Sequence, residues 1–167
     1  TVNLKASGRW SGVIDLPMVP AAAANLANGK VLLWSAYAKD NFGGDNGVTQ
    51  TVTYDPAAVT FTERQVANTG HDMFCPGTAN LADGRVLVNG GSSSARTSLY
   101  DPSSDSWAAG ATMNVPRGYQ GTTVLSAGSV LTLGGSWSGA LGGKDGEVWT
   151  PFGGWRRLSG VPDAPFT

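Results

Sequence analysis

The sequence predicts an all-β protein, and three observations support this. The chain of 167 residues is 41% hydrophobic and only 14% charged, which is typical of a packed globular protein. It contains 24 glycines, many Ser, Thr and Val residues and no long stretch rich in Leu, Glu and Lys. This composition favours short strands joined by tight turns. The third observation is an internal repeat whose units each have the pattern of paired strands around a glycine turn.

The first half of each repeat unit has the pattern of a β-hairpin. Residues 24–34 align with residues 79–89, and a looser copy covers residues 126–135. Each copy places a glycine turn between two apolar runs, which predicts two antiparallel strands. A second hairpin follows each first one, with aromatic residues near its two ends. These aromatic pairs are Tyr54 and Phe61, Tyr100 and Trp107, and Trp149 and Trp155.

Two hairpins per unit give four strands, and the units recur at the period of propeller blades. The turn glycines Gly29, Gly84 and Gly128 are separated by 55 and 44 residues. Four-stranded units at this period are typical of a kelch-type β-propeller. Since propellers close with more blades than this chain contains, we expect about three blades of a seven-bladed propeller, in a chain that is incomplete.

The spacing of the repeat also sets the expected order of units along the chain. The predicted boundaries are 1–17 for a strand that closes the last blade, 18–67, 68–113 and 114–161 for three blades, and 162–167 for the start of a fourth. Trp10 stands where a closing strand of a blade would carry its aromatic residue. We expect it to pack between blades, as the other repeated aromatics do.

Charge and residue counts exclude several classes of function. A formal net charge of −1 gives no basic surface for nucleic acid, and no apolar run is long enough to cross a bilayer. The N-terminus has no signal-peptide pattern, so we expect a soluble chain from which any signal peptide has been removed. Cys75 is the only cysteine and cannot form an intrachain disulfide. His71, the only histidine, cannot build a nitrogen-rich metal site alone and is expected to be structural.

Three residues break the repeat. Cys75 lies 15 residues before Gly90, and Tyr119 lies 15 residues before Gly134, so they are equivalent residues of adjacent blades. Because the first strand of a blade is the innermost, both are expected near the central channel and close enough to meet. Taken alone, Cys75 could also be a small buried hydrophobic residue, and Tyr119 could be an aromatic residue packed in the core. Trp137 has no aromatic counterpart in the other units, and we expect it on a loop over the channel mouth, where it would serve a site.

Motifs spread over nearly the whole chain carry a resemblance to one enzyme family. They are Gly8-Arg9-Trp10, Asp15 to Ala24, Asn41-Phe42-Gly43-Gly44, His71 to Gly77, Thr97 to Asp101, Arg117-Gly118-Tyr119-Gln120, and Gly134 to Gly139. In these motifs the sequence resembles galactose oxidase and related fungal copper-radical alcohol oxidases. The intervals of 44 residues from Cys75 to Tyr119 and 18 residues from Tyr119 to Trp137 are those expected of the family.

The resemblance implies a specific set of site residues. The Cys75 sulfur would be joined covalently to the Tyr119 ring in a thioether cofactor, and the Tyr119 oxygen would be a ligand of a copper ion. Trp137 would stack on the modified ring and shield its radical, and Phe42 would line the substrate mouth. The other copper ligands of the family, a tyrosine and two histidines, are expected in later blades. This segment alone is therefore not expected to be active.

The function that the resemblance implies is oxidation of a primary alcohol to the aldehyde, with reduction of O2 to hydrogen peroxide. The substrate would be a galactose-type sugar or an aryl or alkyl alcohol. The enzyme would be secreted to the extracellular space and monomeric when complete, with no nucleic-acid or membrane partner. The alternative is a non-catalytic kelch propeller that serves as a protein-interaction scaffold. That alternative predicts no copper binding and unmodified Cys75 and Tyr119.

Overall fold

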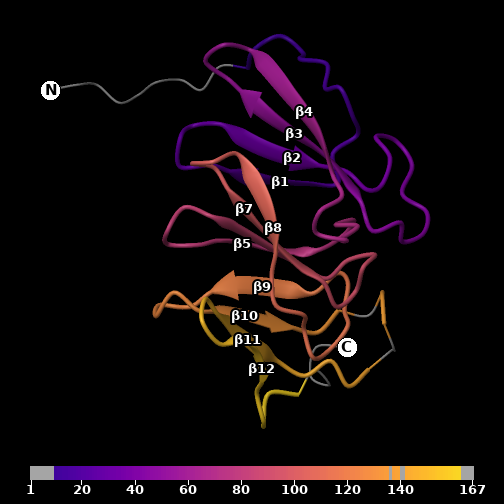
Figure 1. Ribbon diagram of the computed structural model, residues 1–167, viewed down its shortest axis with the longest axis vertical. Coiled ribbons are helices and arrows are strands. Elements are labelled where there is room, and N and C mark those ends of the chain that lie inside the picture. The colour runs from indigo at the N-terminus through magenta and orange to yellow at the C-terminus, as the bar shows by residue number, and fades with distance from the viewer. Residues whose placement is uncertain (1–9, 136, 140–141, 163–167) are drawn as a thin grey trace, which may run out of the picture.

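The computed structural model describes residues 10–135, 137–139 and 142–162, and all the regular structure in these ranges is β-strand. Twelve strands form three antiparallel sheets of four strands each (Figure 1). The prediction of an all-β fold built from propeller blades is confirmed. Within the described ranges, no helix is long and apolar enough to span a membrane.

Each sheet uses four consecutive strands, paired in chain order. The first sheet contains β1 (Ala22–Asn25), β2 (Val31–Trp34), β3 (Thr49–Asp55) and β4 (Thr60–Val66). The second contains β5 (Gly77–Asn80), β6 (Val86–Asn89), β7 (Thr97–Asp101) and β8 (Ser106–Ala109). The third contains β9 (Gly121–Val124), β10 (Val130–Leu133), β11 (Glu147–Thr150) and β12 (Gly154–Arg157). The sheets lie inside the predicted units, while the unit boundaries themselves stay a prediction.

The repeated aromatics lie opposite one another across the outer hairpins. The cross-strand pairs are Tyr54 with Phe61, Tyr100 with Trp107, and Trp149 with Trp155. Aromatic residues directly opposite one another in an antiparallel pair stabilise the hairpin and fix its register. In the second and third sheets all four of these side chains are buried.

The two larger hydrophobic clusters of the described residues lie between neighbouring sheets, while a smaller one of Met18, Leu33 and Val52 lies on the first sheet alone. One cluster joins Trp34 and Leu32 of the first sheet to Val86 and Val88 of the second. Another joins Leu87 of the second sheet to residues of the third. A single sheet cannot bury its two faces alone, so each blade is stabilised mainly by its neighbours.

The first strands of the blades approach each other most closely, which places them on the inside of the arrangement. At Gly77 in β5 an added Cβ would lie 2.0 Å from Oγ1 of Thr122 in β9. A larger residue at position 77 would therefore collide with the Thr122 side chain and push the two strands apart. The residues that precede β5 and β9 are therefore brought together at one end of the blades.

Trp10 does not pack as the repeat predicted. Its side chain is 97% exposed, and residues 10–17 form no strand. Among the described residues, this segment pairs with no strand of the three sheets. The rest of the predicted closing strand, residues 1–9, lies outside the described residues. Its role in a last blade stays a prediction.

Candidate active site

Cys75 and Tyr119 meet at the junction between the second and third blades. Each lies two residues before the first strand of its blade, Cys75 before β5 and Tyr119 before β9. The Tyr119 amide donates a hydrogen bond to the Cys75 carbonyl oxygen at 3.1 Å. Both residues have a left-handed backbone, with φ of 55° and 59°. This is uncommon for residues with a Cβ, and its recurrence shows that the two blades hold the two residues in the same way.

The two side chains are also in contact. The hydrogen bond between the Cys75 thiol and the Tyr119 hydroxyl is the main cause that raises the pKa of Tyr119. Burial raises the pKa of the Cys75 thiol, and the contact with Tyr119 partly opposes this effect. Tyr119 is 61% exposed, so most of the residue remains accessible to solvent. The sequence prediction that these two residues can meet is fulfilled by the geometry, while a covalent bond between them stays a proposal.

Four aromatic side chains follow one another at this end of the blades, and we call them the aromatic row: Phe42, Phe74, Trp137 and Tyr119. The Phe42 and Phe74 rings are stacked, with centroids 4.9 Å apart and an interplanar angle of 15°. The edge contact between Phe74 and Trp137 has a centroid distance of 5.7 Å at 85°. Trp137 then lies 5.2 Å from Tyr119 at 50°. The row connects the loop after β2 to the Cys75–Tyr119 pair.

The geometry differs from the expectation in one respect: Trp137 is tilted over Tyr119 and is not stacked on it. The Phe74 ring meets the indole nearly at a right angle. Edge-to-face and tilted arrangements are favourable for aromatic pairs, so the indole satisfies both neighbours at once.

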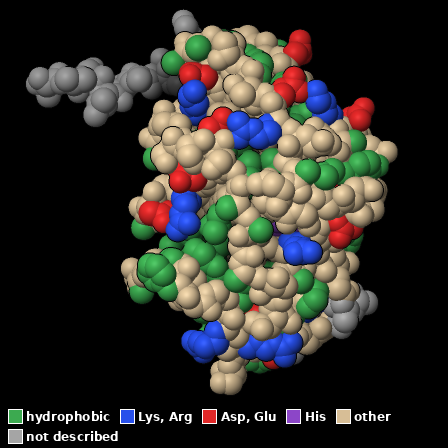
Figure 2. All heavy atoms as spheres, viewed as in Figure 1, with side chains coloured by type: hydrophobic (Ala, Val, Ile, Leu, Met, Phe, Trp, Pro, Cys, Tyr) green, Lys and Arg blue, Asp and Glu red, His purple; other side chains and the backbone are tan. Residues whose placement is uncertain are grey.

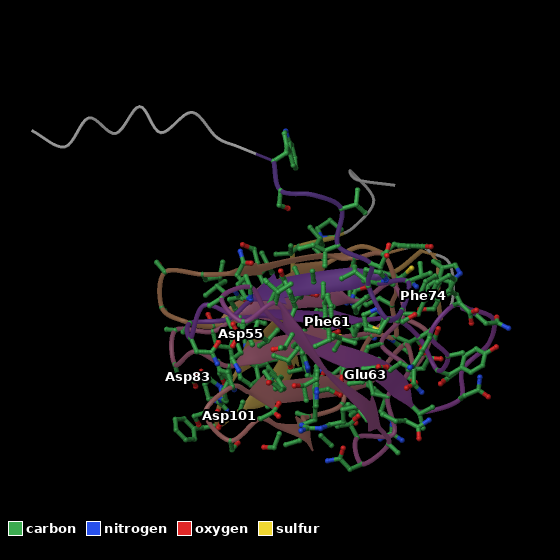
Figure 3. All side chains as sticks on the ribbon, turned by 90° about the horizontal axis from the view of Figure 1, so that it is seen from above. Asp55, Phe61, Glu63, Phe74, Asp83 and Asp101 are labelled. Carbon is green, nitrogen blue, oxygen red and sulfur yellow. The ribbon has the colours of Figure 1, made fainter. Side chains whose placement is uncertain are left out.

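Phe74 is the member of the aromatic row that the sequence analysis left without a role. It belongs to the same motif as Cys75, but its contacts are with residues of two other loops. In Figure 3, Phe74 lies at the opposite end of the blades from Asp55, Asp83 and Asp101. The aromatic row is thus built at the end where the loops after β2 and β10 meet, away from these acidic turns.

Gly118 makes room for the indole of Trp137. An added Cβ at Gly118 would lie 2.6 Å from Cε3 of Trp137 and 2.6 Å from Oγ of Ser138. Ser138 cannot move away freely, because its hydroxyl donates to the Gly91 carbonyl oxygen at 2.7 Å. The position of Trp137 over Tyr119 therefore depends on glycine at position 118.

We expect the substitution Gly118→Ala to displace the Trp137 indole and to lower the free energy of unfolding by about 1–3 kcal/mol, the usual cost of overpacking. Tryptophan fluorescence and thermal unfolding would measure the two effects. The matched control is Gly121→Ala, since a Cβ there would lie 3.9 Å from its nearest neighbour. If the two variants had the same tryptophan fluorescence and the same melting temperature, Gly118 would not set the position of the indole.

A buried ion pair holds the backbone that leads into Tyr119. Arg117 and Glu147 are both 0% exposed, and Nη2 of Arg117 donates to Oε2 of Glu147 at 3.1 Å. The Arg117 guanidinium also donates to the carbonyl oxygens of Val115, Gly134, Lys144 and Asp145. Charged groups remain buried only when they are paired and hydrogen-bonded, as these are.

Glu147 binds the same segment from a second side. Its carboxylate accepts hydrogen bonds from the backbone amides of Asn114 and Val115 at 2.9 and 3.1 Å. The segment 114–117 is thereby tied to β11, the strand that contains Glu147. Tyr119 follows directly after this fixed segment, so its side chain starts from a constrained backbone.

His71 is a structural residue of the second blade. It is fully buried, its Nε2 donates to the Gly90 carbonyl oxygen at 2.8 Å, and its Nδ1 accepts from the Ser98 hydroxyl at 2.8 Å. Both ring nitrogens are engaged, so neither is available to a metal. Burial lowers the pKa of His71 to about 4, which keeps the imidazole neutral.

The next residue, Asp72, is a buried carboxylate whose pKa is shifted in the opposite sense. Burial raises its pKa to about 6, although the amides of Asn46, Phe74 and Tyr37 oppose this effect. Neither carboxylate oxygen has a partner at full hydrogen-bonding geometry among the described residues. Ionisation of Asp72 therefore costs stability in the folded protein.

The two shifts predict opposing effects of pH on stability. Between pH 4 and the ordinary histidine pKa of about 6.5, His71 takes up a proton only when the protein unfolds, so its contribution is lost as the pH falls. Between the ordinary aspartate pKa of about 3.9 and pH 6, Asp72 releases a proton on unfolding, so its contribution to the stability of the fold is lost as the pH rises.

We expect Asp72→Asn to make the melting temperature rise more steeply from pH 4 to 6 than in the protein without the substitution. Thermal unfolding at four pH values would measure the slopes, and equal slopes would contradict the assignment.

The described residues can supply one ligand of a copper ion. Tyr119 is a largely exposed residue, and its phenol oxygen is a suitable ligand atom. No group of three or more His, Cys, Asp or Glu side chains in the ranges that the structure describes could hold a metal ion. Copper in proteins takes several ligands, with imidazole nitrogen prominent among them. The remaining ligands of a copper ion at Tyr119 would therefore have to come from outside these residues.

The fold and the site together define a class: a segment of a β-propeller with a cysteine–tyrosine pair between adjacent blades, under an aromatic row. Comparison with known proteins gives the family that it resembles. The chain is 51% identical over 159 residues to a galactose oxidase of Gibberella zeae, covering 94% of this chain and 23% of that protein. A second galactose oxidase sequence of Gibberella zeae matches with the same values. The predicted resemblance to galactose oxidase is confirmed.

A solved structure agrees with this result. A fungal alcohol oxidase of the AA5 family, in complex with copper, superposes with a TM-score of 0.85 at 40% identity, covering 93% of this chain and 33% of that one. The chain thus spans a third or less of the length of these relatives. No family model matches it.

Proposed function

We propose that this chain is the part of a copper-radical oxidase that carries the radical cofactor. The complete enzyme oxidises a primary alcohol to the aldehyde and reduces O2 to hydrogen peroxide, so that two electrons and two protons pass from the alcohol to O2. The observation that carries the proposal is that the lone Cys75 and Tyr119, equivalent residues of adjacent blades, are joined by a backbone hydrogen bond and share the same left-handed backbone. The similarity to galactose oxidases and to a copper alcohol oxidase supports it.

The cofactor forms by joining the Cys75 sulfur to the ring carbon ortho to the Tyr119 hydroxyl. The S–H bond and one ring C–H bond break, one C–S bond forms, and two protons and two electrons leave. O2 is the oxidant and takes up both, giving hydrogen peroxide. The backbone hydrogen bond from Tyr119 to Cys75 supports this step, because it holds the two residues in register before any bond forms.

The residues of this chain then hold the redox-active ring. The thioether donates electron density into the phenol, which makes removal of one electron easier. Trp137 packs against the ring at a tilt, with centroids 5.2 Å apart, while the largely exposed Tyr119 side chain leaves its oxygen available as a ligand. Copper, when bound, would supply a second one-electron acceptor beside the ring.

Phe42 is the residue of this chain that we assign to the substrate mouth, because it ends the aromatic row that leads to Tyr119. The substrate is a galactose-type sugar or an aryl or alkyl primary alcohol, and O2 is the second substrate.

We further propose that the enzyme is secreted and acts as a monomer. Charges of both signs are scattered over the face drawn in Figure 2, with no continuous basic surface for a polyanion.

The experiment is intact mass measurement of the full-length protein before and after addition of copper in air. The thioether removes two hydrogens, so the mass should fall by about 2 Da, Cys75 should stop reacting with thiol reagents, and peroxide should form from primary alcohols. A protein that binds no copper and keeps a reactive Cys75 would instead be the non-catalytic scaffold, and the proposal would be wrong.

A further inference from the structure

Phe74 is the ring that connects the substrate side of the aromatic row to its radical side. It contacts Phe42 on one side and Trp137 on the other. Among the described rings, Phe42 has no contact with Trp137 or Tyr119 of its own. Any dependence of Phe42 on the position of Trp137 through ring contacts therefore passes through Phe74.

The backbone of Phe74 is fixed. Its carbonyl oxygen accepts a hydrogen bond from the Ser92 amide at 3.1 Å, and an added Cβ at Gly91 would lie 2.4 Å from that oxygen. The preceding residue, Met73, is 0% exposed, and its carbonyl accepts from Nε1 of Trp34 in the first blade. Phe74 thus starts from the packed junction between the first two blades.

Its two ring partners are held less tightly. Phe42 stands in a loop before Gly43 and Gly44, the latter at φ 91°, in a segment stabilised by local turns. The Trp137 side chain is 42% exposed, and its described ring contacts are with Phe74 and Tyr119. A side chain on a looser segment takes its orientation from the rigid surface that it contacts.

The repeat explains why a ring at position 74 affects Trp137. The residue equivalent to Phe74 in the third blade is Gly118, and in the first blade it is Val19. Gly118 leaves the space that the indole fills, and Phe74 supplies the ring that closes this space from the second blade. The two equivalent positions therefore form complementary sides of one slot for Trp137.

From this geometry we infer that Phe74 is a positioning residue that sets both the tilt of Trp137 over Tyr119 and the place of Phe42 at the substrate mouth. The part of this inference that concerns catalysis rests on the proposed function. Its consequence is that substrate binding and the lifetime of the Tyr119 radical respond together to a change at this one ring, although Phe74 itself is assigned no contact with the reacting atoms.

The test compares Phe74→Leu, which removes the ring but keeps an apolar side chain, with Phe74→Tyr, which keeps the ring. In the full-length enzyme we expect Phe74→Leu to raise KM and to shorten the radical lifetime without substrate, each by about three- to tenfold, the scale of an aromatic pair. Phe74→Tyr should restore both values. Phe42→Leu should raise KM alone, and the double variant with Phe74→Leu should be less than additive in KM.

A second readout does not depend on copper or on turnover. The fluorescence of Trp137, taken as the difference between each protein and its Trp137→Phe counterpart, should shift towards that of a solvated indole in Phe74→Leu. It should not shift in Phe152→Leu, a matched control at a fully exposed phenylalanine. Thermal unfolding would identify a variant that fails to fold.

The possible outcomes are distinct. Unchanged Trp137 fluorescence in folded Phe74→Leu, or additive effects of the two phenylalanine substitutions on KM, would overturn the inference. If the protein without any substitution formed no thioether and no radical and showed no activity, the proposed function would be overturned instead. The fluorescence measurement would then still decide whether Phe74 positions Trp137.

Discussion

From the proposed function we expect that replacing Cys75 with serine abolishes oxidase activity in the full-length protein. A serine hydroxyl cannot form the thioether, so Tyr119 would remain an ordinary phenol that is harder to oxidise. We expect a loss of at least about a thousandfold in kcat, the scale on which removal of a covalent catalytic group acts. Peroxide formation from a primary alcohol would measure the activity, and intact mass would show that the loss of two hydrogens no longer occurs.

The control separates the site from general effects on the fold. Tyr119→Phe should be as inactive as Cys75→Ser, because it removes the phenol. Tyr100→Phe removes a hydroxyl that donates to Asp105 at 2.7 Å, away from the aromatic row. It should keep its activity at a cost of about 1 kcal/mol in stability. Activity of Cys75→Ser within about tenfold of the unmodified enzyme would contradict the role of the thioether.

The second large effect is expected at the buried ion pair. Glu147→Gln removes the carboxylate charge that pairs with the buried Arg117 guanidinium. Breaking a buried pair by removal of one partner costs about 3–5 kcal/mol, and we expect a loss of that size in the free energy of unfolding. Chemical denaturation of the variant and the unmodified protein would measure it.

A surface pair provides the comparison. Arg85 and Asp83 are 2.7 Å apart, with side chains 32% and 50% exposed. Asp83→Asn should therefore cost less than about 1 kcal/mol. If Glu147→Gln cost no more than Asp83→Asn, the ion pair would not be what holds the segment before Tyr119.

The repeat made the fold and part of the site predictable. Equivalent glycine turns and aromatics placed four strands in each unit, and the equal phase of Cys75 and Tyr119 predicted that they meet. Trp137 was found because it has no counterpart in the other units. Phe74 satisfies the same criterion, since Val19 and Gly118 occupy its equivalent positions. The repeat therefore marks Phe74 as well, although Phe74 stands in the same motif as Cys75.

Other features could not be seen in the sequence. The burial of Arg117 and Glu147 depends on the docking of segments about 30 residues apart, and charged residues are ordinarily read as exposed. The tilt of Trp137 depends on a ring from another blade. Trp10 was assigned to a closing strand from its spacing alone, and spacing does not reveal whether a partner strand is beside it.

The junction of Cys75 and Tyr119 also bears on the unfolded chain. Because the two residues are 44 positions apart, a covalent bond between them would close a large loop that includes most of the second blade. By the loop-entropy relation used for disulfides, such a closure disfavours the unfolded state by about 4 kcal/mol. Maturation of the cofactor would therefore fasten two blades together permanently, and the mature enzyme should resist denaturation more than its newly folded precursor.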